Sequence, residues 1–185
     1  MSYRSITPNI NVNTESPQLR TELLNTFTRL DGQLGNVPST YYSLNGPTSS
    51  SGAGESNLFT KTLETGTLAQ LGDSILFKIV GQTAANANAK QIKLYADSNA
   101  IFDTGSQTFN GISWVLEGEL VRNGATSQIV YFTMTTSDST YRSTASVTTT
   151  TLNLANNHIF TLTGSGSVNG DVSFYYAKIL LLPRS

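Results

Sequence analysis

Apolar and polar residues alternate with a period of two through most of the chain between residues 58 and 184. Successive side chains of a strand point to opposite faces of a sheet, so this spacing indicates strands with one buried face. Asn-Gly pairs at 110–111, 123–124 and 169–170 suit tight hairpins between such strands. The pattern predicts strands over 58–65, 73–82, 89–97, 112–123, 127–136, 143–151, 158–164 and 171–182. About eight antiparallel strands with no helical pattern among them predict an all-β, two-sheet sandwich of the jelly-roll type.

The composition narrows the classes of function. Charged residues make up 12% of the chain, the net charge is −1, and no run of Lys or Arg is present, so a nucleic-acid partner has no electrostatic footprint. The absence of cysteine excludes disulfides, thiolate catalysis and Cys-based zinc sites. No apolar run is long enough to span a membrane, and the first residues lack the apolar core of a signal peptide. We therefore expect a protein made in a cytoplasm, without a membrane partner.

The first 37 residues have a different pattern. Residues 1–15 carry only scattered apolar side chains, which suits an extended arm that lies along a neighbour. A helix is predicted next, with Ser16 as N-cap, Pro17 at the first helical position and an apolar stripe from Leu19 to Leu34. A lone helix of about 16 residues is marginal in water. Its stripe therefore needs a cover, which the body, sister helices or another protein could provide.

Residues 38–57 are rich in Gly, Ser and Pro, which predicts a flexible linker. The chain is thus expected to contain an N-terminal arm and anchoring helix over 1–37, a linker over 38–57 and a jelly-roll domain over 58–185.

Three stretches of the body, GDSILFKIVGQT, ISWVLEGELVR and GDVSFYYAKILLLP, resemble the jelly-roll domains of bacteriophage decoration (cement) and fibre-type virion proteins. Those domains are similar to the trimeric sandwich of tumour-necrosis-factor-like proteins. The opening SPQLRTELLNTFTRLDGQLG resembles the helical N-terminal segment of small phage structural proteins. The resemblance implies a homotrimer on a virion, bound to the major capsid protein or another virion protein by its N-terminal arm.

Two sets of contact residues follow. The strand over 171–182 becomes continuously apolar near its end, and a strand apolar on both faces is covered on both faces. This favours a subunit interface, for which the predicted residues are Trp114, Tyr175, Ile179 and Leu181. The predicted capsid anchors are the apolar residues of the arm and helix, namely Ile6, Ile10, Val12, Leu19, Leu23, Phe27 and Leu30.

Candidate chemistry is sparse. His158 is the one histidine, and the sequence points to no partner carboxylate or nucleophile for it, so we expect a surface or interface residue. Glu117 and Glu119 share a strand face, which is more typical of a solvated surface than of an acid pair in a glycosidase. We therefore predict no catalytic residues, no cofactor and no metal site.

Two alternatives to the cement protein remain. The first is a tail-fibre or receptor-binding module that recognises host surface glycan. The second is a tail-spike depolymerase, which requires that substitution of Glu117 or Glu119 abolish its activity.

Overall fold

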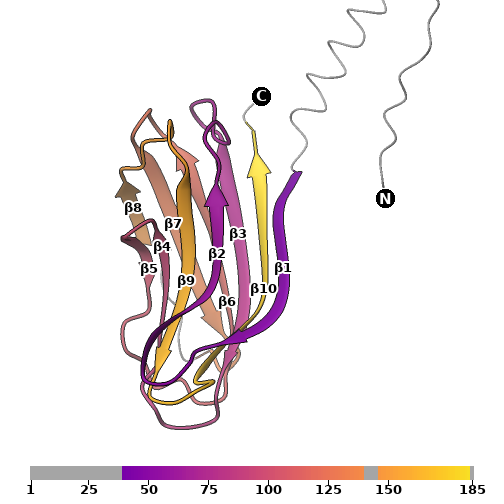
Figure 1. Cartoon of the computed structure of the whole chain (residues 1–185), viewed down its shortest axis with the longest axis vertical. Coiled ribbons are helices and arrows are strands. Elements are labelled where there is room, and N and C mark those ends of the chain that lie inside the picture. The colour runs from indigo at the N-terminus through magenta and orange to yellow at the C-terminus, as the bar shows by residue number, and fades with distance from the viewer. Residues whose placement is uncertain (1–38, 140–145, 184–185) are drawn as a thin grey trace, which may run out of the picture. The chain divides into compact units, whose positions relative to one another are not determined.

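The computed structural model describes residues 39–139 and 146–183, and the regular structure in these ranges consists of ten β-strands (Figure 1). The strands form two antiparallel sheets. Sheet A contains, in spatial order, β1 (Ser39–Ser49), β10 (Val172–Leu182), β3 (Ser74–Thr83), β6 (Ser113–Arg122), β7 (Gln128–Thr136) and β8 (Ser146–Thr150). Sheet B contains β2 (Gly54–Leu63), β9 (His158–Gly166), β4 (Gln91–Ala96) and β5 (Asn99–Asp103). The predicted two-sheet sandwich is therefore confirmed, while the predicted arm and helix lie outside the described residues.

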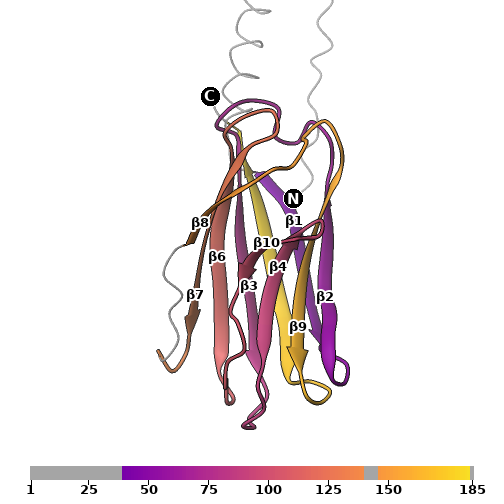
Figure 2. The same ribbon diagram turned by 90° about the vertical axis from the view of Figure 1, so that its left-hand side faces the viewer.

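The strand pairs are nested along the chain. β4 pairs with β5, β3 with β6, β2 with β9 and β1 with β10, each antiparallel. Nested antiparallel pairs distributed over two sheets are what a long hairpin gives when it is wrapped into a jelly roll. β7 and β8 are additional to this set and extend sheet A beyond β6, which Figure 2 shows as the strands at one side of the sandwich.

Aromatic rings join the two sheets in the core. The Phe77 ring lies 5.7 Å from that of Phe132, which is also in sheet A, measured between ring centroids. It lies 5.2 Å from the ring of Phe160, which is in sheet B. Gly118 provides space for this cluster, because a Cβ atom at this position would lie 2.1 Å from Cδ1 of Phe132. Gly81 does the same for Trp114, its partner across β3 and β6. Inward side chains and two strand glycines thus fit together as one close-packed core.

The chain between residues 38 and 57 differs from the predicted linker. It contains β1 and the start of β2, and β1 pairs along its length with β10. The sequence reads as a linker because β1 is polar and contains Gly46 and Pro47. As an edge strand it tolerates both: the register shifts between Asn45 and Thr48, so a bulge accommodates the proline, which has no N–H to donate.

The Asn-Gly pairs have different roles. Asn123-Gly124 connects β6 and β7, which pair with each other, so this hairpin prediction is correct. Asn110-Gly111 and Asn169-Gly170 instead lie where the chain passes from sheet B to sheet A. Turn chemistry signals a reversal of the chain, but it does not determine whether the next strand pairs with the last one or crosses to the other sheet.

A buried polar cluster closes the loops beside β9 and β10. Asp171 is fully buried and accepts hydrogen bonds from the side chains of Asn86 and Asn88 and from the backbone N–H groups of Ser167 and Val168. Burial alone would raise the pKa of Asp171, but these donors lower it to about 2. The buried Lys90 ammonium donates to the Asn86 side-chain oxygen at 2.7 Å. The cluster ties the β3–β4 loop to the β9–β10 loop.

Candidate functional site

The outer face of sheet A is apolar, although it lies on the side away from the core. We call the outward side chains of β3, β6, β7 and β10 face A. Most are half-buried, while Tyr131 is 46% exposed. In an antiparallel sandwich the outer face is commonly solvated and polar. The apolar members of face A are Leu76, Val80, Val115, Val121, Ile129, Tyr131, Tyr176, Leu180 and Leu182.

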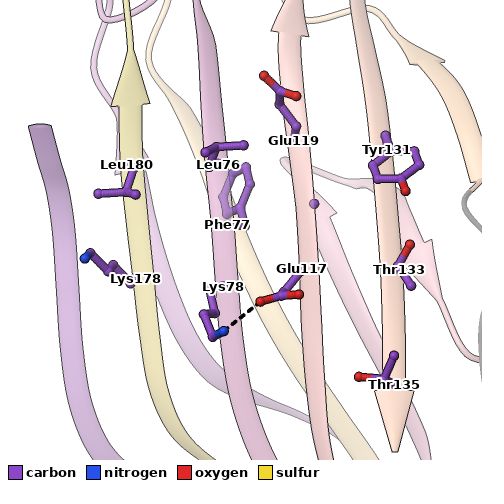
Figure 3. A pocket seen from close by; sticks show the side chains of 11 residues that line it. Leu76, Phe77, Lys78, Glu117, Glu119, Tyr131, Thr133, Thr135, Lys178 and Leu180 are labelled. Atoms are coloured by element: carbon purple, nitrogen blue, oxygen red, sulfur yellow. Dashed lines mark hydrogen bonds and ion pairs between the residues drawn. The ribbon is translucent and has the colours of Figure 1, made fainter. Parts of the chain in front are cut away.

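Cross-strand register places these side chains in rows. Leu180 lies opposite Leu76, Leu76 opposite Glu119, and Glu119 opposite Tyr131. The neighbouring row contains Lys178, Lys78, Glu117 and Thr133 in the same strand order. Figure 3 shows both rows, with the side chains of β10, β3, β6 and β7 around a shallow hollow of about 660 Å³.

Face A carries four charged side chains, of which Lys78 and Glu117 are exposed while Glu119 and Lys178 are half-buried. Lys78 and Glu117 form an ion pair with a nitrogen–oxygen distance of 2.7 Å, the dashed line in Figure 3. Their side chains are 54% and 58% exposed, so the pair contributes little to stability. Glu117 and Glu119 do share a strand face as predicted, on an open sheet surface with Glu117 bound to Lys78.

The four predicted interface residues do not lie together on face A. Trp114 and Ile179 are buried in the core, and Leu181 packs against it. Tyr175 is 42% exposed and donates to the Gln82 side chain at 3.2 Å. For Ile179 and Leu181 the cause is a bulge between Phe174 and Tyr176, which adds one residue to β10 and reverses the alternation beyond it. Trp114 is buried because it shares the inward face of β6 with Leu116 and Leu120.

Beyond the bulge, the outward residues of β10 are therefore Tyr176, Lys178, Leu180 and Leu182. The strand is apolar on both faces, as the sequence predicted. The sequence-based prediction, however, assigned the inward side chains Ile179 and Leu181 to the outer face. The bulge itself leaves no signal in the sequence. The predicted anchors Ile6, Ile10, Val12, Leu19, Leu23, Phe27 and Leu30 lie outside the described residues.

His158 is buried within the chain, whereas the sequence predicted a surface or interface residue. Its Nδ1 lies 2.7 Å from Oδ2 of Asp97 and its Nε2 lies 2.8 Å from the Asn153 carbonyl oxygen. Burial pushes the pKa of Asp97 up, but the Ile159 N–H and the imidazole bring it below its ordinary value. Both ring nitrogens thus already have partners, which is the geometry of a structural tie between β9 and two loops.

The described ranges contain no group of three or more His, Cys, Asp or Glu residues that could hold a metal ion. In the same ranges no helix has the length and apolar character needed to cross a membrane.

Comparison with known proteins gives limited likenesses. No family profile matches the chain, and no curated protein matches its sequence. Among solved structures, a protein of unknown function from Shewanella oneidensis MR-1 is 9% identical with a TM-score of 0.43, over 97% of this chain and 99% of that one. A structure of infectious bursal disease virus, Gx strain, is 12% identical with a TM-score of 0.34, over 78% of this chain and 32% of that one.

Proposed function

We propose that this chain is a structural subunit of a virus particle, which self-associates as a homotrimer through face A. Its N-terminal residues would attach it to the major capsid protein, as in a decoration or cement protein. The jelly-roll sandwich is compatible with the broader viral structural role. The trimer and the capsid contact come from the resemblance of the sequence to phage virion proteins.

The observation that carries the proposal is the apolar character of face A. Each buried Å² of apolar surface contributes about 25 cal/mol, so covering the apolar side chains of face A would stabilise a contact. Sister copies of the chain present the same surface, so each copy can cover another. The Lys78–Glu117 pair gives this surface both signs of charge, which favours contact between copies over contact with a strongly charged partner.

The capsid attachment would depend on avidity. Three arms joined through one trimeric body engage neighbouring sites together, so a modest affinity of each arm gives tight attachment. The apolar side chains of residues 6–30 would fill seams between capsid subunits.

The self-association is tested with the full-length Leu76→Asp variant, measured by light scattering. An aspartate beside Glu119 places unpaired negative charge in the contact, so we expect the trimer mass to fall to that of one chain. Ile159→Asp is the matched control, because Ile159 is 48% exposed on sheet B, and it should keep the trimer mass. A wild-type chain that is monomeric, or a Leu76→Asp variant that stays trimeric, contradicts the role of face A.

The attachment is tested by cosedimentation with capsids built from the major capsid protein of the same genome. We expect the full-length double variant Leu23→Asp, Phe27→Asp to remain trimeric but to lose capsid binding. Binding equal to that of the wild type would remove the anchoring role of residues 1–37.

A further inference from the structure

The outer face of sheet B contains a hollow of a different kind. We call the outward side chains of β2, β4 and β9 face B. A polar hollow of about 410 Å³ lies on this face, lined by side chains of all three strands and of the turn after β4. Because it is on the sheet opposite face A, it stays open to solvent when face A is covered.

A bulge in β2 lies beside the hollow. The pairing of β2 with β9 shifts between Asn57 and Phe59, so that Leu58 and Phe59 are both buried in the core. On either side of the bulge the outward side chains of β2 are Asn57 and Thr60, which lie opposite Thr163 and Thr161 of β9. Bulges commonly re-aim side chains in this way beside functional sites.

Two carboxylates in the hollow are held in place. Glu55 accepts from the Thr163 hydroxyl at 2.6 Å, from Lys93 at 3.1 Å and from the Tyr95 hydroxyl. Although burial raises its pKa, these donors bring it below the ordinary value, so Glu55 stays ionised.

Asp97, at the other side of the hollow, is fixed by the Ile159 N–H at 2.8 Å and by His158 at 2.7 Å. Each carboxylate oxygen can accept more than one hydrogen bond. The two carboxylates are therefore rigid hydrogen-bond acceptors. A ligand that binds them does not have to order their side chains, so binding loses less side-chain entropy.

The other residues that line the hollow supply hydrogen-bond donors and acceptors, which a ligand with several hydroxyl groups requires. Asn57, Ser98 and Thr161 bring amide and hydroxyl groups that both donate and accept. Tyr95 adds an aromatic body with a polar tip, and the Lys93 ammonium lies 5.8 Å from its ring centroid. Two carboxylates against one lysine leave the hollow negative, which disfavours acidic ligands.

We propose that the face B hollow binds a neutral saccharide, with Glu55 and Asp97 accepting from its hydroxyl groups and Tyr95 packing beside its ring. The site does not depend on the virion role or on the trimer. If the hollow binds no saccharide, the proposed self-association through face A still stands. If face A does not self-associate, the proposed saccharide site still stands.

The test is saturation-transfer NMR on the full chain. Glucose, galactose, mannose and N-acetylglucosamine are the neutral probes, and glucuronic acid is the acidic probe. We expect saturation transfer to at least one neutral probe and none to glucuronic acid. Glu55→Gln keeps the shape but removes the charge, and should weaken binding about tenfold, as expected for the loss of a charge-assisted hydrogen bond.

Two further variants complete the design. Asp103→Asn is the matched control, an equal substitution on sheet B outside the hollow, and should bind as the wild type does. Ser98→Trp should block the hollow from the turn if Glu55→Gln proves to be unfolded. Absence of transfer to every neutral probe, equal binding by Ser98→Trp, or preference for glucuronic acid would each overturn the proposal.

Discussion

Face A and face B belong to the same sandwich but meet different surroundings. Face A carries nine apolar side chains and four charged ones, and its hollow is lined by leucine, tyrosine and threonine together with two lysines and two glutamates. Face B carries threonines, Gln91, Lys93 and Tyr95, with Ile159 as an isolated exposed apolar residue. Since both sheets turn equally apolar faces to the core, the difference lies entirely on the outer side. The fold of the single chain does not require apolar side chains on an outer face, and this is why we propose self-association through face A.

The charges follow the same division. On face A the ion pair between Lys78 and Glu117 is more than half exposed. On face B the pair between Lys93 and Glu55 is less exposed and belongs to a network with Thr163 and Tyr95. The ion pair of face A is therefore open to solvent, whereas Glu55 and Lys93 of face B are already held by hydrogen bonds within the chain.

The largest expected effect is on stability, and it tests whether Trp114 belongs to the inward side of sheet A or to face A. Trp114 was predicted at a subunit interface but is fully buried in the core. Trp114→Ala should therefore lower the free energy of unfolding by about 3–5 kcal/mol, through lost burial and the cavity that remains. Chemical denaturation at several protein concentrations measures this. A loss of trimer mass with unchanged stability of the monomer would restore the interface assignment and break the distinction between the two sides.

The next effect concerns the loops that join the sheets. The folded-state pKa of Asp171 is about 2, below the value of about 3.9 in an unfolded chain, so its contribution is present above that value and is lost as the pH falls toward 2. Asp171→Asn should cost about 2 kcal/mol at neutral pH. Wild-type and variant stabilities should converge near pH 2, and a difference that stays constant with pH would show that Asp171 is not the titrating group.

The sequence predicted the sandwich because alternation depends on burial, and burial is regular in the central strands. It missed β1 and β5, since an edge strand with Pro47 and a five-residue strand such as Asn99–Asp103 carry little alternation. Of the predicted interface residues, Trp114 and Ile179 are buried in the core. For Ile179 the reason is the bulge before Tyr176, which exchanges the two sides of β10. The face B hollow was out of reach because Glu55 meets Thr163 across 108 positions, through the pairing of β2 with β9.

The smallest expected effect compares the two ion pairs directly. The pair on face A is the shorter, 2.7 Å against 3.1 Å, but the pair on face B has side chains only 20% and 36% exposed. The exposure of the side chains affects the strength of each pair more than the distance does. Solvent screens the attraction in an exposed pair, so the attraction does not offset the side-chain entropy lost in forming it. Lys78→Met should change the free energy of unfolding by less than about 0.5 kcal/mol, and Lys93→Met should lower it by about 1 kcal/mol.

Double-mutant cycles with Glu117→Gln and Glu55→Gln isolate each coupling. The coupling on face B should persist at high salt, while that on face A should vanish. If the two couplings are equal in the monomer, the polar groups of face B are no more ordered than those of face A. The contrast between the faces would then rest on their apolar side chains alone.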